Sequence, residues 1–130
     1  MTIKGQCVMS GTSQDELIVI EVSGKSLYFS LVRRDSESIV LKDNQDGSEL
    51  VVKVCRTFEF SSDRKMMTVI VKMDGKQYAF VKGADTSMEP NCINLDDSDK
   101  MTLDDLDDFA EQGLRTLVYA YKEMPLMSEE

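Results

Sequence analysis

Histidine is absent from the 130-residue chain, and cysteine is scarce. The three cysteines, Cys7, Cys55 and Cys92, are odd in number and widely spaced, so the sequence suggests neither a disulfide framework nor a common zinc site. Without histidine, no nucleophile can be activated by an imidazole, which excludes triad chemistry of that kind. This cysteine usage is typical of a reducing compartment, and we expect a cytosolic location.

Long hydrophobic runs are also missing. No apolar stretch approaches the ~20 residues that a membrane helix requires, and residues 1–6 carry no apolar segment of a signal peptide. The chain as written is therefore expected to be soluble. The motifs G-x-x-x-x-G-K-[ST] and G-x-G-x-x-G do not occur, which argues against P-loop and Rossmann nucleotide binding.

Negative charge outweighs positive charge, and the net charge is −9. Such a chain repels nucleic acids and anionic membrane surfaces, so we expect no nucleic-acid partner. Any anion that binds must find a local cluster of cations. With 42% hydrophobic residues the chain can bury one core, and domains run to about 100–150 residues. Residues 1–130 are therefore predicted to form a single domain.

The N-terminal third contains one helix signal. Residues 1–12 show no periodicity and are expected to be a loose lead-in, whereas Ser13-Gln14-Asp15-Glu16 has the S-x-x-E form of a capping box. In such a box the Glu16 side chain would reach back to the Ser13 N–H. The following residues 17–20 have strand-like composition. The helical alternative places five apolar residues near one face: Leu17, Ile20, Leu27, Tyr28 and Leu31.

From Ser38 onward, apolar residues recur with the period of two that is typical of half-buried strands. A short strand is predicted at 39–41 and a turn at 43–47. A long strand with one buried face follows at 50–60, and two more strands are predicted around 67–71 and 78–80. Asp74-Gly75 has the composition of a hairpin turn. These strands are expected to be consecutive antiparallel neighbours.

The last part of the chain is acidic. Residues 86–101 are predicted to be irregular, and Thr102 is expected to cap a helix that Gly113 ends. Its expected apolar stripe consists of Leu103, Leu106, Phe109 and Ala110. The acidic residues lack EF-hand spacing, so they indicate a solvated helix face rather than a calcium site. A final strand is predicted at 114–121 and a frayed tail at 124–130. The pattern as a whole predicts an α+β fold.

Three stretches carry residues of chemical interest. Phe60 lies in Phe58-Glu59-Phe60-Ser61-Ser62-Asp63-Arg64-Lys65-Met66-Met67, Lys82 begins Lys82-Gly83-Ala84-Asp85, and Arg115 lies in Gly113-Leu114-Arg115-Thr116-Leu117. An aromatic ring could serve as a platform for a flat base, and a guanidinium suits phosphate oxygens. The common alternatives are a core phenylalanine, a solvated lysine and a surface arginine. Asp63 and Arg64 could simply pair with each other.

These motifs, in this order and together with Ser13-Gln14-Asp15-Glu16, resemble the nucleotide-binding domain of P-type ATPases, most closely its phospholipid-flippase branch. The resemblance covers roughly residues 13–122. It implies a helix after Ser13 and a twisted antiparallel sheet flanked by helices. Flippases carry Ser-Pro-Asp-Glu at the first motif, and Gln14 replaces the proline here. The Asp-Lys-Thr-Gly phosphorylation motif is not in the chain, so the resemblance implies one domain excised from a larger membrane ATPase.

The resemblance also implies a set of nucleotide-binding residues. The residue matching Phe60 stacks on adenine, the one matching Lys82 lines the cleft, and the one matching Arg115 reaches the phosphates. Smaller roles are implied for five residues: Glu16 accepts from the adenine amino group, Ser62 and Met67 border the base and ribose, Lys65 adds positive potential, and Leu117 walls the base pocket. No catalytic residue and no metal ligand is expected in this chain.

The implied function is that of an ATP-binding cytosolic domain of a phospholipid-transporting ATPase, an integral membrane protein. Mg²⁺ would be coordinated mainly outside the fragment, which alone should not turn over. The implied partners are ATP and the phosphorylation and actuator domains of the same parent chain. The phospholipid substrate would contact only the transmembrane part of the parent protein. Two alternatives stay open: an interaction or regulatory module that keeps the fold without binding nucleotide, and a small β-rich domain for an unrelated ligand.

Overall fold

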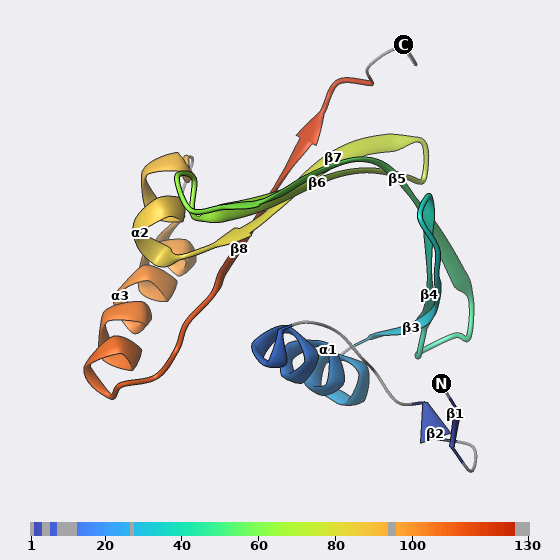
Figure 1. Cartoon of the computed structure of the whole chain (residues 1–130), viewed down its shortest axis with the longest axis horizontal. Coiled ribbons are helices and arrows are strands. Elements are labelled where there is room, and N and C mark those ends of the chain that lie inside the picture. Colours follow the sequence, from blue (N-terminus) through green and yellow to red (C-terminus); the bar gives the residue numbers. More distant parts are fainter. Residues whose placement is uncertain (1, 4–5, 8–12, 27, 94–95, 127–130) are drawn as a thin grey trace. The chain divides into compact units, whose positions relative to one another are not determined.

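The computed structural model describes all residues except 1, 4–5, 8–12, 27, 94–95 and 127–130 (Figure 1). The chain divides into two compact units, Met1–Val52 and Lys53–Glu130. None of the described helices is both long enough and apolar enough to cross a membrane.

Strands and helices in the described residues follow the predicted α+β class. Their bounds are β1 Thr2–Ile3, β2 Gln6–Cys7, α1 Gln14–Ser26, β3 Phe29–Arg34, β4 Ser38–Asp43, β5 Glu49–Ser61, β6 Met66–Met73, β7 Lys76–Gly83, α2 Asp85–Met88, α3 Asp97–Glu111 and β8 Val118–Met124, with a 3-10 turn at Glu89–Asn91. Strands β1 and β2 pair with each other, and the other six form one sheet in the order β3-β4-β5-β6-β7-β8. Because sheet order equals chain order, the predicted succession of hairpins is confirmed.

In the first unit, helix α1 begins after Ser13, as the S-x-x-E pattern predicts. The Ser13 hydroxyl accepts a hydrogen bond from the Glu16 N–H at 3.4 Å, which satisfies one of the N–H groups left open at a helix start. The helix ends at Ser26. The helical alternative is wrong beyond that point, because Leu31 lies in β3 opposite Leu41. Leu27 lies outside the described residues.

Strands β3 and β4 form an antiparallel hairpin whose turn is held by Asp35. The Asp35 carboxylate accepts hydrogen bonds from the N–H of Glu37 at 2.9 Å, the N–H of Ser38 at 2.8 Å and the Ser38 hydroxyl at 2.9 Å. These bonds favour the ionised carboxylate and lower the pKa of Asp35. The strand predicted at 39–41 is confirmed within β4, and the predicted turn follows, with Gly47 at a φ of 78°.

In the second unit, β6 and β7 are joined by the predicted Asp74-Gly75 turn. Both residues have positive φ, 50° and 72°, as tight hairpin turns require. Strand β8 pairs with β7 from Met124 opposite Gln77 to Val118 opposite Gly83. The last strand therefore lies later than predicted: residues 114–117 precede it, and Met124 belongs to β8 rather than to a frayed tail. Residues 127–130 of the predicted tail lie outside the described residues.

Strand β5 lacks the uninterrupted alternation predicted for residues 50–60. Its register against β6 shifts between Val54 and Arg56 and again between Phe58 and Ser61. At each bulge two residues of β5 stand opposite one residue of β6. Because one extra residue moves the following side chains to the other face, the expectation of a single buried face along this strand is wrong.

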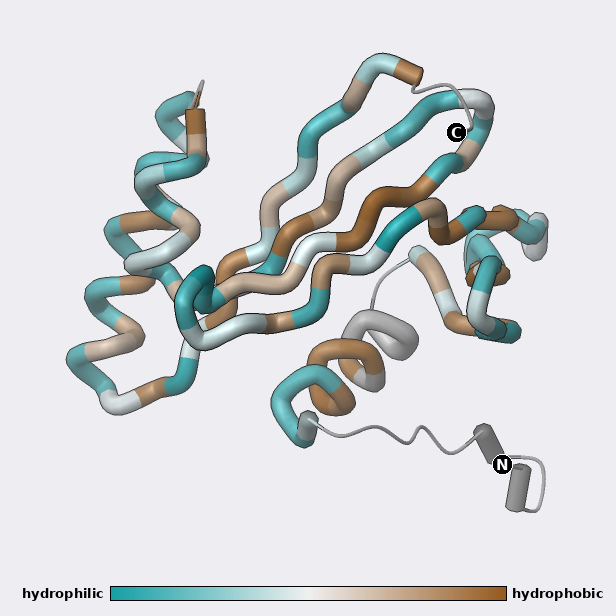
Figure 2. The backbone as a smooth tube through the Cα atoms, turned by 45° about the horizontal axis from the view of Figure 1, so that its top comes forward, coloured by the Kyte–Doolittle hydropathy of each residue, from teal (hydrophilic) through white to brown (hydrophobic). Residues whose placement is uncertain are grey.

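The buried core of the second unit is small. Val71 on β6 is 4% exposed and Met88 on α2 is 2% exposed. Helix α2 packs against β7 and β8, within a stretch that was predicted to be irregular. Figure 2 shows hydrophobic residues interspersed with polar ones along the strands, and hydrophilic residues over much of α3.

Helix α3 begins earlier than predicted because Asp96, not Thr102, caps it. The Asp96 carboxylate accepts from the Asp99 N–H at 2.9 Å, and the Asp99 carboxylate accepts from the Asp96 N–H at 3.1 Å. The Thr102 hydroxyl instead donates to the Ser98 carbonyl at 3.1 Å. The predicted stop is confirmed, since the helix ends at Glu111 and Gly113 follows with a φ of 72°.

The two faces predicted for α3 differ in how well they match the structure. The acidic side chains are exposed, as expected of a solvated face. The apolar stripe is covered only in part: Leu103 and Leu106 are half-buried, whereas Phe109 is 44% exposed. Phe109 is therefore no core residue within this chain.

Candidate functional site

A row of side chains crosses the sheet of the second unit from β5 to β8. Met67 lies opposite Lys82, and Lys82 lies opposite Tyr119. On β5, the second bulge leaves Glu59 and Phe60 together opposite Met67. Directly opposed residues project from the same face of a sheet. Phe60, Met67, Lys82 and Tyr119 thus share one face, and we call them the Phe60 row.

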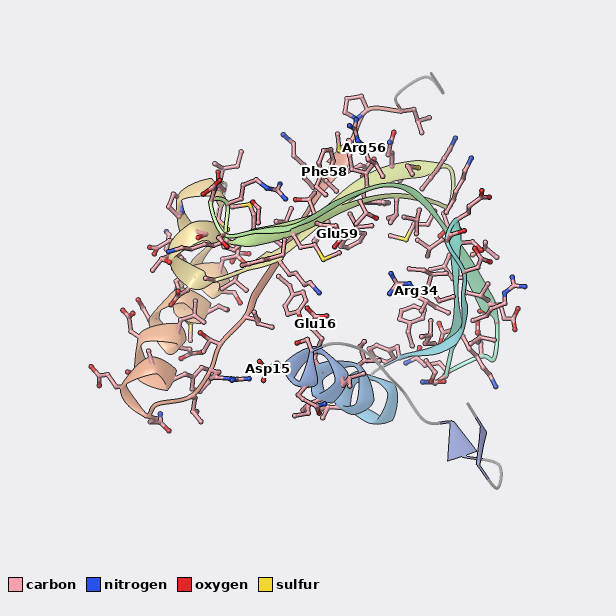
Figure 3. All side chains as sticks on the ribbon, in the orientation of Figure 1. Asp15, Glu16, Arg34, Arg56, Phe58 and Glu59 are labelled. Atoms are coloured by element: carbon pink, nitrogen blue, oxygen red, sulfur yellow. The ribbon has the colours of Figure 1, made fainter. Side chains whose placement is uncertain are left out.

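The second bulge separates two phenylalanines of one motif. Phe58 lies opposite Thr68 on the other face, where its ring centroid is 4.8 Å from the Arg56 guanidinium carbon and 6.0 Å from that of Arg64. Figure 3 shows Arg56 and Phe58 on one side of the sheet and Glu59 on the other. Phe60 is 61% exposed. The core role that is common for a strand phenylalanine therefore does not apply to Phe60 within this chain.

The turn after Phe60 has a defined backbone. The Lys65 N–H donates to the Ser61 carbonyl at 2.7 Å, and Lys65 has a φ of 53°. The Ser61 hydroxyl accepts from the Arg64 N–H at 3.3 Å. The side chains of Ser62 and Lys65 are exposed on this turn. Both predicted residues therefore lie close to Phe60 at the same end of the sheet.

The alternative that Asp63 pairs with Arg64 is not found in the described residues. The Arg64 guanidinium instead donates to backbone carbonyls, and the shortest of these hydrogen bonds is 2.9 Å, to Glu59. Among the described residues, no salt bridge joins Arg64 to Asp63. The side chain of Arg64 thus turns back onto its own hairpin.

The second motif meets this turn at Gly83. The Ala84 N–H donates to the Lys65 carbonyl at 3.3 Å. A Cβ atom on Gly83 would lie 2.6 Å from the Lys65 carbonyl oxygen and 2.9 Å from the Met66 Cβ. Two backbone segments therefore approach closely at this glycine, and the contact holds the Lys-Gly-Ala-Asp motif against the turn that follows Phe60.

We predict that Gly83→Ala lowers the free energy of unfolding by about 1–3 kcal/mol, the usual cost of overpacking. The added methyl meets backbone, which cannot rotate away. Denaturant unfolding monitored by circular dichroism measures the effect. Gly75→Ala is the comparison variant. Gly75 has a φ of 72° and nothing within 4 Å of an added Cβ, so any loss of stability there reports backbone strain and not a steric clash. An unchanged midpoint for Gly83→Ala would contradict the close contact.

The third motif reaches the same end of the sheet. The Leu114 N–H donates to the Phe109 carbonyl at 3.0 Å as the chain leaves α3, and residues 114–117 then run to β8. Arg115 is exposed and Leu117 is 40% exposed. Since Val118 lies opposite Gly83, Leu117 arrives beside the second motif. The structure thus places six predicted residues of the second unit at one end of its sheet: Phe60, Ser62, Lys65, Met67, Lys82 and Leu117. Arg115 lies on the segment that leads from α3 into β8.

Glu16 belongs to the first unit, where it occupies the first turn of α1. Its N–H is held by the Ser13 hydroxyl, so the first half of the predicted capping box is present. The side chain is half-buried. Its role toward a nucleotide stays a prediction.

Four more aromatic residues lie on the same sheet face and were not among the predicted site residues. Tyr119 completes the Phe60 row and is 53% exposed. Next to it, the rings of Tyr78, Phe80 and Tyr121 form a cluster with centroids 5.9–6.5 Å apart. The alternation of Leu117, Tyr119 and Tyr121 in the sequence places these three side chains on one face and could have identified both tyrosines.

The donors of the Phe60 row do not suit a metal ion. Magnesium prefers carboxylate and phosphate oxygens, whereas this row offers an aromatic ring, a thioether, an ammonium and a phenol. Within the described part of the chain, no group of three or more Cys, Asp or Glu side chains is arranged to hold a metal ion.

Comparison with known proteins relates the chain to one family. Residues 29–129 match the family model described as P-type ATPase, cytoplasmic domain N. The chain is 34% identical over 127 residues to phospholipid-transporting ATPase FetA of Mus musculus, covering 94% of this chain and 10% of that protein. It is 33% identical over 114 residues to phospholipid-transporting ATPase NEO1 of Saccharomyces cerevisiae, covering 86% of this chain and 10% of that protein.

A bacterial relative is also similar. The chain is 41% identical over 91 residues to a probable cation-transporting P-type ATPase of Mycoplasma genitalium, covering 68% of this chain and 10% of that protein. The chain thus spans about a tenth of the length of the curated relatives it matches.

Proposed function

We propose that this chain, which belongs to the family of P-type ATPase cytoplasmic N domains, binds ATP by its adenosine end. The observation that carries the proposal is the exposed ring of Phe60, which lies on one sheet face with Met67 and Lys82. A purine gains ~1–3 kcal/mol by stacking on such a ring. Phe60 is the proposed floor for adenine, and Met67 borders it.

Cations at this end of the sheet are proposed to meet the phosphates. The net charge of the chain is −9, so a polyanion requires local positive charge. Lys65 and Lys82 belong to the two motifs that meet here, and Arg115 belongs to the motif that leads into β8. We assign the phosphates chiefly to Arg115, because its guanidinium offers a rigid fork of donors. Lys82 lines the cleft and Lys65 adds positive potential.

The remaining assignments rest on the family resemblance. Ser62 is proposed to border the base and ribose, Leu117 to wall the base pocket, and Glu16 to accept from the adenine amino group. The exposure of Ser62 and Leu117 beside the Phe60 row supports the first two. The assignment of Glu16 requires the first unit to approach the nucleotide.

We propose further that residues 1–130 form one nucleotide-binding domain of a larger membrane ATPase and lie on its cytosolic side. Such a domain holds the adenosine end and presents the γ-phosphate to an aspartate on the phosphorylation domain, so catalysis rests on positioning within the assembly. Mg²⁺ would be held mainly outside this chain, which by itself would not hydrolyse ATP. The actuator domain would be a second partner within the parent.

The transported substrate is proposed to be a phospholipid. The mouse and yeast relatives reported above are phospholipid-transporting ATPases by name, and each match covers more of this chain than that of the bacterial cation-transporting relative. The lipid would be met only by the transmembrane part of the parent protein.

A nucleotide titration of the isotope-labelled chain tests the binding proposal. Because the base is read by stacking, we expect ATP, ADP and AMP to shift the same backbone amide signals, those around Phe60, Lys82 and Arg115. The measurement is a set of two-dimensional NMR spectra at increasing nucleotide concentration. Shifts confined to α3, or no shifts at millimolar ATP, would contradict binding and favour an interaction module that keeps the fold.

A further inference from the structure

Arg64 is bonded to the backbone of the bulge that contains Phe60. Its Nη2 atom donates to the carbonyl of Glu59 at 2.9 Å, of Met66 at 3.3 Å and of Phe58 at 3.4 Å. These carbonyls belong to both strands of the β5–β6 hairpin and border the irregular step between Phe58 and Ser61. One guanidinium therefore joins the two strands where their register is broken.

The bulge decides the face to which the Phe60 ring belongs. Phe58 and Ser61 lie opposite Thr68 and Met66, which are two residues apart on β6 and share one face. Only the inserted residue allows Phe60 to stand opposite Met67 on the other face. With regular pairing from Phe58 onward, Phe60 would follow Phe58 onto the face that carries Arg56, away from Lys82.

The contacts of Arg64 compensate for the ladder hydrogen bonds that a bulge loses. An inserted residue leaves backbone groups unpaired, and a charged donor bonds to carbonyls more strongly than a neutral one does. Arg64 also lies over the Phe58 ring, 6.0 Å from its centroid, which limits the directions in which its side chain can turn.

We propose that Arg64 is a positioning residue for nucleotide binding: its guanidinium holds the Phe58–Ser61 bulge and so keeps the Phe60 ring on the face of Met67 and Lys82. The inference rests on the proposed nucleotide-binding function. In this role Arg64 acts through the Phe60 ring and touches neither the base nor the phosphates.

A double-mutant cycle with Phe60 tests this role. We expect Arg64→Ala to weaken the binding of ATP and of AMP by the same factor, about three- to tenfold, as expected for losing a few exposed hydrogen bonds. In a Phe60→Ala background the same substitution should have no further effect, because the ring that Arg64 positions is gone. Calorimetry or NMR titration measures the dissociation constants of the wild type, the two single variants and the double variant.

Arg56→Ala is the matched control. Arg56 also places a guanidinium over the Phe58 ring, at 4.8 Å, but in the described structure it makes no hydrogen bond to the three bulge carbonyls. We expect it to leave AMP binding unchanged. Arg64→Lys keeps the charge but loses the fork, so it should restore binding only in part. If Arg64→Ala does not fold, Arg64→Lys replaces it in the double-mutant cycle. It should then weaken ATP and AMP equally and have no further effect in the Phe60→Ala background.

Two results would overturn the inference. A loss confined to ATP would mean that Arg64 meets the phosphates, and a loss that persists in the Phe60→Ala background would mean that it acts elsewhere. Cross-strand contacts between Phe60 and Met67, measured by NMR without nucleotide, should weaken in Arg64→Ala. Failure of the wild-type chain to bind nucleotide contradicts the proposed function, whereas unchanged contacts and binding in Arg64→Ala contradict only the role of Arg64.

Discussion

Phe60→Ala is expected to weaken the binding of ATP, ADP and AMP alike, by about 5- to 150-fold, while the chain stays folded. The loss corresponds to the ~1–3 kcal/mol that a base gains by stacking on an aromatic ring. Because Phe60 is 61% exposed, its removal should cost much less stability than the ~3–5 kcal/mol typical of a core phenylalanine. Titration calorimetry measures the affinity, and thermal unfolding measures the stability.

Two control variants separate binding from packing. Met88→Ala truncates a side chain that is 2% exposed and should lower stability by ~2–5 kcal/mol. Tyr121→Ala removes an exposed aromatic ring from the same sheet face, outside the proposed contact set, and should leave affinity nearly unchanged. If Phe60→Ala melts as early as Met88→Ala, the ring is part of the core. If it binds nucleotide like the wild type, the stacking assignment is wrong.

Strands β4 to β7 were predictable from the sequence because the turns between them are short and chemically distinct. Asp74-Gly75 offers the two positive φ values that a tight hairpin needs, and Gly47 lies at the turn between β4 and β5. Strand β3 was not predicted, because Tyr28 and Leu31 also fit the apolar face of the preceding helix. Local signals of this kind do not reveal bulges. Leu50 to Phe60 alternate cleanly in sequence, yet two inserted residues change the face of the strand twice, since register depends on the partner strand.

The boundaries of α3 and β8 show a second limit of sequence reasoning. Asp96 and Asp99 form a reciprocal capping box, but in a run of several acids any one of them could serve as the cap. Thr102 is also a capping residue by type, but its hydroxyl donates to the Ser98 carbonyl within the helix instead. The start of β8 depends on β7, because Val118 is the residue that meets Gly83.

The candidate site residues that belong to a recognised sequence motif could be predicted. Residues that lie beside the site only because of strand pairing or a bulge could not. The first two motifs meet because Gly83 touches the turn at Lys65, and the third leads into β8, whose first residue, Val118, pairs with Gly83. Tyr119 and Arg64 were not predicted, although both lie within or beside the motifs. Their positions follow from strand pairing and from the bulge, which residue types alone do not define.

Arg115→Ala is expected to weaken ATP binding by about tenfold or more and AMP binding by much less. Hydrogen bonds to charged groups contribute ~1.5–3 kcal/mol, and the guanidinium fork loses partners only when the β- and γ-phosphates are present. Dissociation constants of ATP and AMP for wild type and variant give the comparison. Lys53→Ala is a matched control for removing one positive charge, because Lys53 lies on β5 and outside the three motifs.

Salt supplies an independent test of the same assignment. Contacts between exposed charges are screened over ~8–10 Å near physiological ionic strength, so added salt should narrow the difference between ATP and AMP in the wild type. In Arg115→Ala this difference should already be small and should respond less to salt. Equal losses of ATP and AMP in the variant would show that Arg115 shapes the base pocket or the fold. The phosphates would then have to be assigned to Lys65 and Lys82, whose motifs meet at Gly83.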